Sequence, residues 1–320
     1  MAAATIDRVR SRMQAVAEDV GRAIVGKEDV VRLVLASLLS RGHVLIEDVP
    51  GVGKTTLAKA VAKAVGCSFG RIQFTPDLLP SDVTGTPVYS QKTGEFQFRP
   101  GPIFANIVLA DEINRAMPKT QSALLESMEE LQVTADGTTY RMPQPFLVIA
   151  TQNNVEHGST YPLPEAQLDR FLARVSVGYP SKRDEVAVLD AQMREHPLAQ
   201  VTAVMTPDEL ALLQEDVKDV HVDDSLKDYI VEIVGATRGR PEVLLGASPR
   251  GSLAVMRLAR ALAAIAGRNY VLPDDIKAAA VPALAHRLVL GESAWRSDSA
   301  QHIIREILSA VPVPVRYGRT

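Results

Sequence analysis

Apolar positions in the first half of the chain follow two different spacings, and each spacing predicts a different kind of element. Residues 6–24 carry apolar side chains at steps of three and four, which is the period of one helical face. The runs 44–46, 107–110 and 146–150 are short and apolar throughout, as is typical of strands buried on both faces of a parallel sheet. Strands that alternate with helices predict an α/β domain with a parallel sheet.

Shorter strands and two hairpins complete the predicted α/β part. We expect strands at 71–74 and 174–177, and hairpins at 86–99 and 132–142, the second of which turns at Asp136-Gly137. The second arm of the first hairpin alternates polar and apolar residues, as a half-exposed strand does. The first hairpin interrupts the run between two core strands and is therefore expected to be an insertion.

The pattern changes after residue 205, where only helices are expected. Their predicted ranges are 207–217, 224–236, 249–267, 274–289 and 298–310. The first of them begins at Thr206-Pro207-Asp208-Glu209, a capping box with proline at the first helical position. The predicted organisation is an α/β domain over 1–185, a linker over 186–205 and an all-α domain over 206–320.

Composition narrows the functional classes. The chain has 320 residues, and its 35 basic and 38 acidic side chains give a net charge of −3, so no global basic field draws it to nucleic acid or membranes. The single Cys67 excludes an intramolecular disulfide and fits a reducing compartment. The chain lacks an apolar run of 18 residues, and its start lacks the order of a signal peptide. We therefore expect a cytoplasmic protein without membrane insertion.

The clearest chemistry lies between the strand at 44–46 and the helix that follows it. The residues there are Asp48, Val49, Pro50, Gly51, Val52, Gly53, Lys54, Thr55 and Thr56. A glycine-bearing loop that ends in Gly-Lys-Thr between a strand and a helix predicts a phosphate-binding P-loop. We expect the segment from Val49 to Thr56 to hold the phosphates of a nucleotide.

Each residue type in this loop has a chemical reason. Gly51 and Gly53 let backbone N–H groups close on phosphate oxygens, and the helix N-terminus favours an anion. Lys54 supplies a cation to the β and γ phosphates, and the Thr55 hydroxyl suits Mg²⁺. Asp48 stands where the motif usually has its first glycine, and the sequence offers no explanation for it.

Two later strand ends carry residues that suit phosphoryl transfer. The run 107–110 ends in Asp111-Glu112, where Asp111 could hold Mg²⁺ through its water shell and Glu112 could polarise the attacking water. Asn153 follows the next buried strand, at the sheet edge where ligands bind. Its amide could hydrogen-bond the attacking water or a γ-phosphate oxygen. A solvated acidic strand end and a turn-forming asparagine are the plainer alternatives.

Two arginines could complete such a site. Arg170 lies on a predicted short helix and could reach the γ-phosphate of a neighbouring subunit, as arginine fingers do. Arg250 begins a helix of the second domain and could reach phosphate across a cleft. The alternative for Arg170 is a surface ion pair with Asp169 or Glu165.

Together these segments resemble one family. The motifs that carry the resemblance are Glu47–Thr55, Leu109–Arg115, Ala150–Asn153, Tyr161–Phe171 and Gly246–Arg250. They are strongly similar to those of the MoxR family of AAA+ ATPases, over about residues 6–311. The stretch Pro-Leu-Pro-Glu-Ala-Gln-Leu-Asp-Arg-Phe is especially specific.

The resemblance implies a P-loop AAA+ core with an all-α lid, in a ring that is usually hexameric and binds ATP and Mg²⁺ between subunits. The implied roles are Walker A for Lys54 and Thr55, Walker B for Asp111 and Glu112, sensor 1 for Asn153, arginine finger for Arg170 and sensor 2 for Arg250. The hairpins at 86–99 and 132–142 match the helix-2 and pre-sensor-1 inserts.

Two further points come from the resemblance. Val25 and Gly26 match the segment that packs near adenine, and Lys27 stands where the family usually has glutamine. The lid of this clade is displaced, so Arg250 could act on the nucleotide of its own subunit or on that of a neighbour.

The leading functional hypothesis is an ATPase that couples hydrolysis to remodelling or maturing a client protein complex. By resemblance, the partner carries a von Willebrand factor A (VWA) domain, and the assisted step is often metal or cofactor insertion. The alternatives are a magnesium-chelatase-like subunit, a motor on DNA and a nucleotide-gated binding module. The slightly acidic chain argues against DNA, and the intact catalytic set argues against a binding module.

Overall fold

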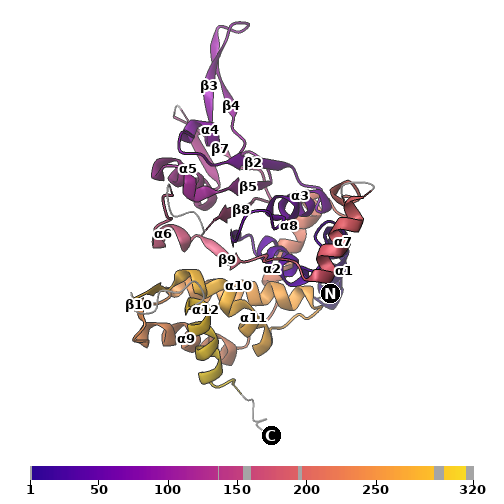
Figure 1. The fold of residues 1–320 in the computed structure, drawn as a ribbon, viewed down its shortest axis with the longest axis vertical. Helices are drawn as coiled ribbons and strands as arrows, with labels where there is room; N and C mark the ends of the chain where they lie inside the picture. The colour runs from indigo at the N-terminus through magenta and orange to yellow at the C-terminus, as the bar shows by residue number, and fades with distance from the viewer. Residues whose placement is uncertain (1, 136, 154–159, 194–196, 292–298, 315–320) are drawn as a thin grey trace.

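The computed structural model of the chain describes residues 2–135, 137–153, 160–193, 197–291 and 299–314 (Figure 1). A sheet flanked by helices forms the upper part in that view, a helical layer lies below it, and a long hairpin projects from the top. None of the described helices is long and apolar enough to cross a lipid bilayer.

The central sheet has five parallel strands in the order β2–β5–β8–β1–β9. These strands are β2 (Phe69–Gln73), β5 (Ile107–Asp111), β8 (Leu147–Gln152), β1 (His43–Glu47) and β9 (Phe171–Val175). The predicted parallel α/β sheet is therefore confirmed. Two strands begin earlier than the sequence predicted: β2 at Phe69 rather than residue 71, and β9 at Phe171 rather than residue 174. Both early starts come from pairing with a neighbouring strand, which local periodicity does not report.

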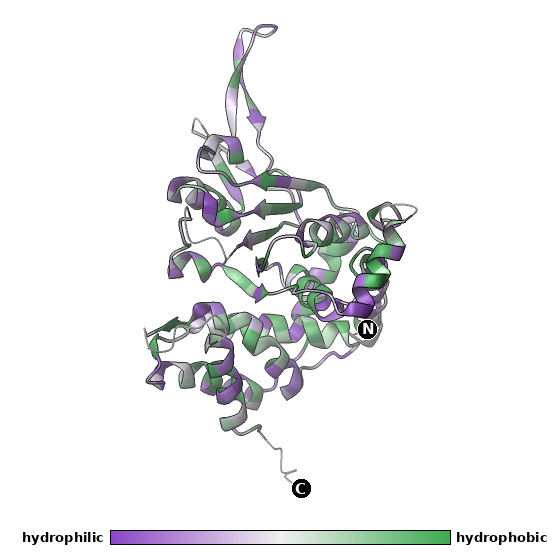
Figure 2. Ribbon diagram, in the orientation of Figure 1, coloured by the Kyte–Doolittle hydropathy of each residue, from purple (hydrophilic) through white to green (hydrophobic). Residues whose placement is uncertain are grey.

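Side chains alternate across this sheet into two buried clusters. Val44 and Ile46 of β1 pack in the larger cluster and Leu45 in the smaller. The larger cluster also takes buried residues of α1 (Ala2–Ala23), α2 (Glu28–Leu39) and α3 (Lys54–Ala64), and the smaller one takes those of α4 (Pro80–Thr84) and α5 (Pro118–Glu130). Figure 2 shows the same distribution, with hydrophobic residues along the central strands and along the helix beneath them.

Both predicted hairpins form. The first pairs β3 (Gly85–Ser90) with β4 (Glu95–Pro100), and the second pairs β6 (Gln132–Ala135) with β7 (Thr138–Arg141). Asp136 of the second turn lies outside the described residues. The rings of Phe98 and Tyr140 stack with centroids 4.0 Å apart, so the two hairpins are joined near their bases. Nearer the tip, Tyr89 packs edge-on against Phe96, which is 71% exposed.

The C-terminal part is helical as predicted, with one addition. Its helices are α8 (Pro207–Asp216), α9 (Asp224–Ala236), α10 (Pro249–Ile265), α11 (Pro273–Leu284) and α12 (Ser299–Ala310). Residue 298, the predicted start of the last helix, lies outside the described residues. The addition is a two-stranded antiparallel sheet of β10 (Val243–Leu245) and β11 (Val289–Leu290). These strands have two or three residues each and are too short to show an alternating pattern. Helix α11 ends at Leu284 rather than at residue 289, because a 3-10 turn (Ala285–Arg287) and then β11 follow it.

The segment between the α/β part and the helical part contains a helix. This helix is α7 (Lys182–Gln192), whose N-terminus is capped by Ser181. The predicted capping box at α8 forms, because Thr206 and Glu209 each accept a hydrogen bond from the other's backbone N–H.

Helix α1 connects the two parts of the molecule. It packs against α3 beside the sheet, against α8, and against α10 in the helical layer. Arg8 pairs with Asp216 at 2.6 Å, and Arg12 pairs with Glu209 at 3.0 Å. The sheet and the helical layer therefore share one continuous hydrophobic core.

A buried histidine supports the start of β1. The His43 Nδ1 accepts a hydrogen bond from Val148 N at 3.0 Å, so the other ring nitrogen, Nε2, carries the proton and donates to Met128 O at 3.2 Å. Burial lowers the pKa of His43 from 6.5 to about 4. The neutral imidazole thus joins β1, β8 and α5 inside the fold.

This histidine predicts a loss of stability in mild acid. The unfolded chain takes up a proton on His43 near pH 6.5 and the folded chain only near pH 4, so the unfolded state binds more protons between these values and stability falls as pH is lowered. Across this whole pH window, the free energy of unfolding falls by on the order of 3 kcal/mol because of His43. Urea unfolding at pH 6.5 and pH 5.0 should show a smaller decrease for His43→Gln than for wild type. The exposed His221→Gln serves as control, and equal decreases for His43→Gln and wild type would contradict the prediction.

Candidate functional site

The predicted P-loop joins β1 to α3. Gly51 and Gly53 have φ angles of 83° and 89°, a conformation that favours glycine, and Gly53 caps the N-terminus of α3. Lys54 is the first residue of that helix, and its Nζ donates to the backbone oxygen of Asp48 at 2.9 Å. The loop thus presents a helix N-terminus and a folded-back ammonium group at one place.

Lys54 lies close to the acidic residues of the predicted site. Burial lowers its pKa below the ordinary value of a lysine. Nearby carboxylates oppose that shift, namely Asp48, Asp111 and Glu112. The structure therefore brings Lys54 close to Asp111 and Glu112, as the predicted site requires.

Asp48 has a structural role that the sequence did not reveal. Its carboxylate accepts hydrogen bonds from Ser176 Oγ at 2.9 Å and from the backbone nitrogen atoms of Gly178 at 2.6 Å and Val49 at 2.8 Å. The residue that replaces the usual glycine therefore ties the entrance of the loop to the chain that follows β9. The contacts with Ser176 and Gly178 span 128 and 130 residues of sequence, which explains why the motif alone gave no reason for Asp48.

Asp111 is held from two neighbouring strands. One carboxylate oxygen accepts from the Thr151 hydroxyl on β8 at 2.7 Å, and the other accepts from Arg71 on β2 at 2.7 Å. The side chain is nearly buried, and both bonds fix its direction at the end of β5.

Glu112 leaves the strand in a left-handed conformation, with φ at 57°. Its backbone N–H donates to Thr151 Oγ1 at 2.8 Å, so Thr151 contacts both acidic residues. Its carboxylate accepts from Gln73 at 2.9 Å and from Arg115 at 3.0 Å. The positive φ turns Glu112 away from the direction that the strand would give it.

Sequence reasoning missed the side chains that hold these acids. They are Arg71, Gln73 and Thr151. A signal was present, because Arg71 and Gln73 alternate with the buried Ile72, which predicts that both lie on one face of β2. The parallel register places Gln73 opposite Asp111, and only the strand order reveals that neighbour.

Asn153 follows β8 at the same edge of the sheet. The backbone N–H of Asp48 donates to Gln152 O, so the end of β8 lies against the entrance of the P-loop. Asn153 is 5% exposed, and its backbone oxygen accepts a hydrogen bond from Asn114. The carboxyl ends of β1, β5 and β8 therefore gather four predicted site residues: Lys54, Asp111, Glu112 and Asn153.

The donor atoms at this edge fit Mg²⁺. Thr55 and Asp111 offer hard oxygen atoms, and Mg²⁺ usually keeps several waters while binding one or two such side chains and phosphate oxygens. Asp111 already accepts two hydrogen bonds, which suits a carboxylate that holds the ion through its waters.

The predicted adenine segment lies beside the P-loop. The Ile24 side chain comes within 3.6 Å of the place that a Cβ on Gly53 would occupy. Gly26 has a φ of 71°, a conformation that favours glycine, and a Cβ there would lie 2.3 Å from the Asp184 carboxylate, which would have to move. Lys27 donates to Tyr179 O at 2.8 Å, which gives this departure from the family pattern a backbone contact of its own. Val25, which lies between Ile24 and Gly26, is half-buried.

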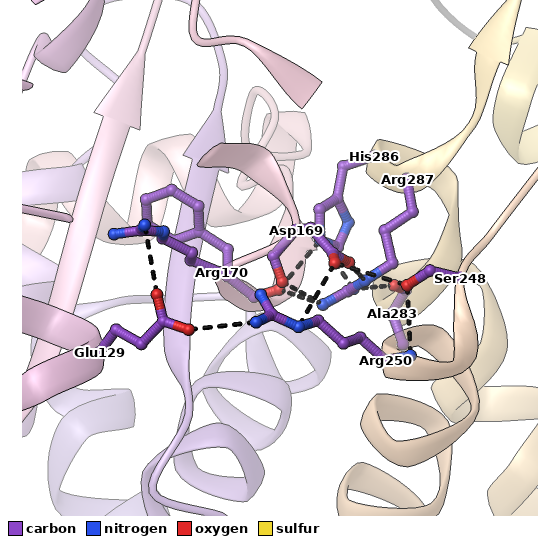
Figure 3. Close-up of polar contacts among 9 residues, drawn as sticks. Glu129, Asp169, Arg170, Ser248, Arg250, Ala283, His286 and Arg287 are labelled. Carbon is purple, nitrogen blue, oxygen red and sulfur yellow. Dashed lines mark hydrogen bonds and ion pairs between the residues drawn. The ribbon is translucent and has the colours of Figure 1, made fainter. Parts of the chain in front are cut away.

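The two predicted arginines form a second group. Arg170 lies between α6 (Glu165–Leu168) and β9, Arg250 lies in the first turn of α10, and both pair with Glu129 near the end of α5, at 3.2 and 3.1 Å (Figure 3). The observed partner of Arg170 is therefore Glu129, and neither Asp169 nor Glu165 appears as its ion-pair partner in the described structure.

A cavity of about 320 Å³ lies beside these arginines, between the helical layer and the α/β part. Arg170, Arg250, Glu129 and Asp169 line it together with other residues, and its lining contains no residue of the P-loop and none of Asp111, Glu112 or Asn153. Within one chain, the predicted site residues thus fall into two groups: one at the carboxyl edge of the sheet and one around Glu129.

Comparison with known proteins agrees with this arrangement. A family model described as "ATPase family associated with various cellular activities (AAA)" matches residues 43–173, and an "AAA lid domain" model matches residues 235–307. The first range holds the P-loop, both acids, Asn153 and Arg170. The second holds Arg250.

Whole-chain similarity is also high. The "Uncharacterized protein YeaC" of Bacillus subtilis is 56% identical over 93% of this chain and 94% of its own length. The "Chaperone MoxR1" of Mycobacterium tuberculosis is 46% identical over 92% of this chain and 81% of its own. The crystal structure of a candidate ATPase from Cytophaga hutchinsonii superposes with a TM-score of 0.90 at 40% identity, over 97% of both chains. The chain therefore belongs to the MoxR family of AAA+ ATPases.

Proposed function

We propose that this protein binds and hydrolyses ATP at a site shared between two copies of the chain in a closed ring, which the family usually builds as a hexamer. The observation that carries the proposal is the separation of the site residues into two groups within one chain. A head-to-tail contact brings the second group of one copy to the first group of the next, and such contacts generate rings when the rotation closes.

The first half of the site holds the nucleotide. Val25 and Gly26 lie beside adenine, and the loop from Val49 to Thr56 surrounds the phosphates. Lys54 leaves the backbone oxygen of Asp48 and pairs with the β and γ phosphates. Bound Mg²⁺, held by Thr55 and by Asp111 through water, would neutralise charge on the phosphate oxygens.

Glu112 and Asn153 orient the attacking water. The water oxygen bonds to the γ-phosphorus, the bond to the bridging oxygen breaks, and ADP leaves with that oxygen. The Glu112 carboxylate accepts the proton of the water. In the isolated subunit Gln73 and Arg115 both donate to Oε2 of this carboxylate, and we assign its Oε1 to the water.

The second half supplies positive charge from the neighbour. Arg170 and Arg250 share one carboxylate, Glu129, so they point toward the same region of space. That region is separate from the P-loop of their own chain. This supports the assignment of both arginines to the nucleotide of the adjacent copy.

The proposed output is the remodelling of a client protein complex in the cytoplasm. The projecting hairpin exposes Tyr89 and Phe96, which could contact a client, and its stack on Tyr140 connects it to the chain segment that leads into β8. One relative is named a chaperone. A VWA-domain protein is the proposed partner, and metal or cofactor insertion is the proposed assisted step.

The role of Glu112 predicts a variant that binds but does not turn over. Glu112→Gln keeps the shape of the side chain and removes the proton acceptor, so ATP hydrolysis should fall by about 10²- to 10⁴-fold, while ADP binding stays within about twofold of wild type. Steady-state phosphate release and equilibrium binding measure the two effects. The exposed Glu126→Gln on α5 is the matched control and should hydrolyse ATP normally. Undiminished turnover by Glu112→Gln would remove this residue from its role.

The shared site predicts complementation between two inactive variants. Arg170→Ala and Arg250→Ala should each reduce turnover, by about 10³-fold or more for the finger, and should leave ADP binding to the isolated subunit intact. Each arginine variant should regain activity when mixed with Lys54→Ala. In a mixed ring, the intact P-loop of an arginine variant lies beside the intact arginines of a Lys54→Ala subunit. If Arg250→Ala instead weakens nucleotide binding in the isolated subunit, Arg250 acts on its own nucleotide.

A further inference from the structure

One buried arginine of the helical layer contacts the chain on both sides of Arg170. Arg287 follows α11, and its side chain is only 4% exposed. Its Nε donates to the Asp169 carboxylate at 2.7 Å, and a terminal nitrogen donates to the backbone oxygen atoms of Asp169 at 3.0 Å and Phe171 at 2.7 Å (Figure 3). The residues before and after Arg170 are therefore held by a single guanidinium group.

The other end of this arginine is anchored within the helical layer. Its second terminal nitrogen donates to Ala283 O in the last turn of α11, and the same nitrogen lies 3.5 Å from Leu172 O of β9. The planar fork of an arginine can make several such bonds at fixed angles, whereas a lysine ammonium on a flexible stem cannot reproduce them. This contact consequently fixes the direction of the backbone from which Arg170 projects.

The same carboxylate also connects to Arg250. The Arg250 Nε lies 4.0 Å from the second oxygen of Asp169, while the first oxygen accepts from Arg287. Asp169 is thus shared by Arg250 and Arg287, both of them in the helical layer.

We propose that Arg287 is a positioning residue for Arg170: it transmits the position of the helical layer of one subunit to the arginine that completes the neighbour's ATP site. The proposal rests on the shared site proposed above. Arg287 acts through the Asp169 carboxylate and through the backbone oxygen atoms on either side of Arg170.

Arg287→Lys tests this role. The substitution keeps the charge next to Asp169 and removes the fork. A displacement of about 1 Å at a reacting group can cost about 10²-fold in rate, so we expect kcat for ATP to fall by roughly that factor. ADP binding to the isolated variant should stay within about twofold of wild type, because the P-loop half of its site is unchanged. The thermal midpoint and circular dichroism of the variant report its fold.

Two readouts separate positioning from general support of the fold. Mixing Arg287→Lys with Lys54→Ala should restore turnover, since the defect lies in the arginine that a subunit gives to its neighbour. In addition, Arg287→Lys should cause no further loss of kcat in the Arg170→Ala background, because both changes remove the same interaction. A second full loss in that background would overturn the proposal, and so would a kcat of Arg287→Lys within twofold of wild type.

A matched control uses another arginine–aspartate pair of the helical layer. Arg268 makes a bidentate pair with Asp275, with both bonds at 2.7 Å. Its hydrogen bonds within the described residues go to Tyr270 and Asp275, away from the segment around Arg170. Arg268→Lys should leave kcat within about twofold of wild type. If Arg287→Lys does not fold, Asp169→Asn replaces it in the complementation assay. This variant removes the carboxylate that Arg287 and Arg250 share, so its turnover should be restored by Lys54→Ala, and a failure to complement would overturn the proposal.

The outcomes also distinguish this proposal from the one on which it rests. If Arg170→Ala and Lys54→Ala complement each other and Arg287→Lys and Lys54→Ala do not, the shared site stands and the role of Arg287 fails. If neither pair complements, the shared site is wrong and the role of Arg287 falls with it.

Discussion

The parallel direction of the central strands is the constraint on which the site depends. Because β1, β5 and β8 run the same way in adjacent positions, their carboxyl ends meet at one edge of the sheet. The P-loop, the two acids and Asn153 each follow one of these strands directly. Their convergence needs no special loop geometry beyond the positive φ angles of Gly51, Gly53 and Glu112.

The arginines obey a different constraint, since they depend on the packing of the helical layer against the α/β part. Glu129 lies on α5, Asp169 caps the end of α6 and Arg287 follows α11, and their ion pairs with Arg170, Arg250 and each other form only when these elements are in place. The residues at the carboxyl edge of the sheet are therefore fixed by the sheet, whereas the group around Glu129 is fixed by a contact between two layers. A motion of one layer against the other would change the group around Glu129 and leave the residues at the sheet edge in place.

Sequence patterns predicted the elements whose causes are local. The P-loop, the acids after an apolar run, the hairpin with Asp136-Gly137 and the capping box at Thr206 all depend on neighbours within a few residues. The roles of Asp48, Gln73 and Arg287 depend on partners 39 to 130 residues away. Alternation with Ile72 predicts the face of β2 on which Gln73 lies, but it does not identify the partner of Gln73. The early start of β9 and the small β10–β11 sheet were not predicted for the same reason, because pairing with a distant strand determines both.

The position of α1 affects how the chain folds as it is synthesised. Its apolar face, which includes Val9, Met13 and Val16, is covered partly by α3 and partly by α8 and α10. Because α10 ends at Ile265, the cover is complete only about 240 residues after α1 has been made. At ribosomal speeds of about 5–20 residues per second, this interval is roughly 10 to 50 s. Throughout that time the nascent chain carries an incompletely buried helix at its beginning, and a chain truncated before residue 249 would carry it permanently.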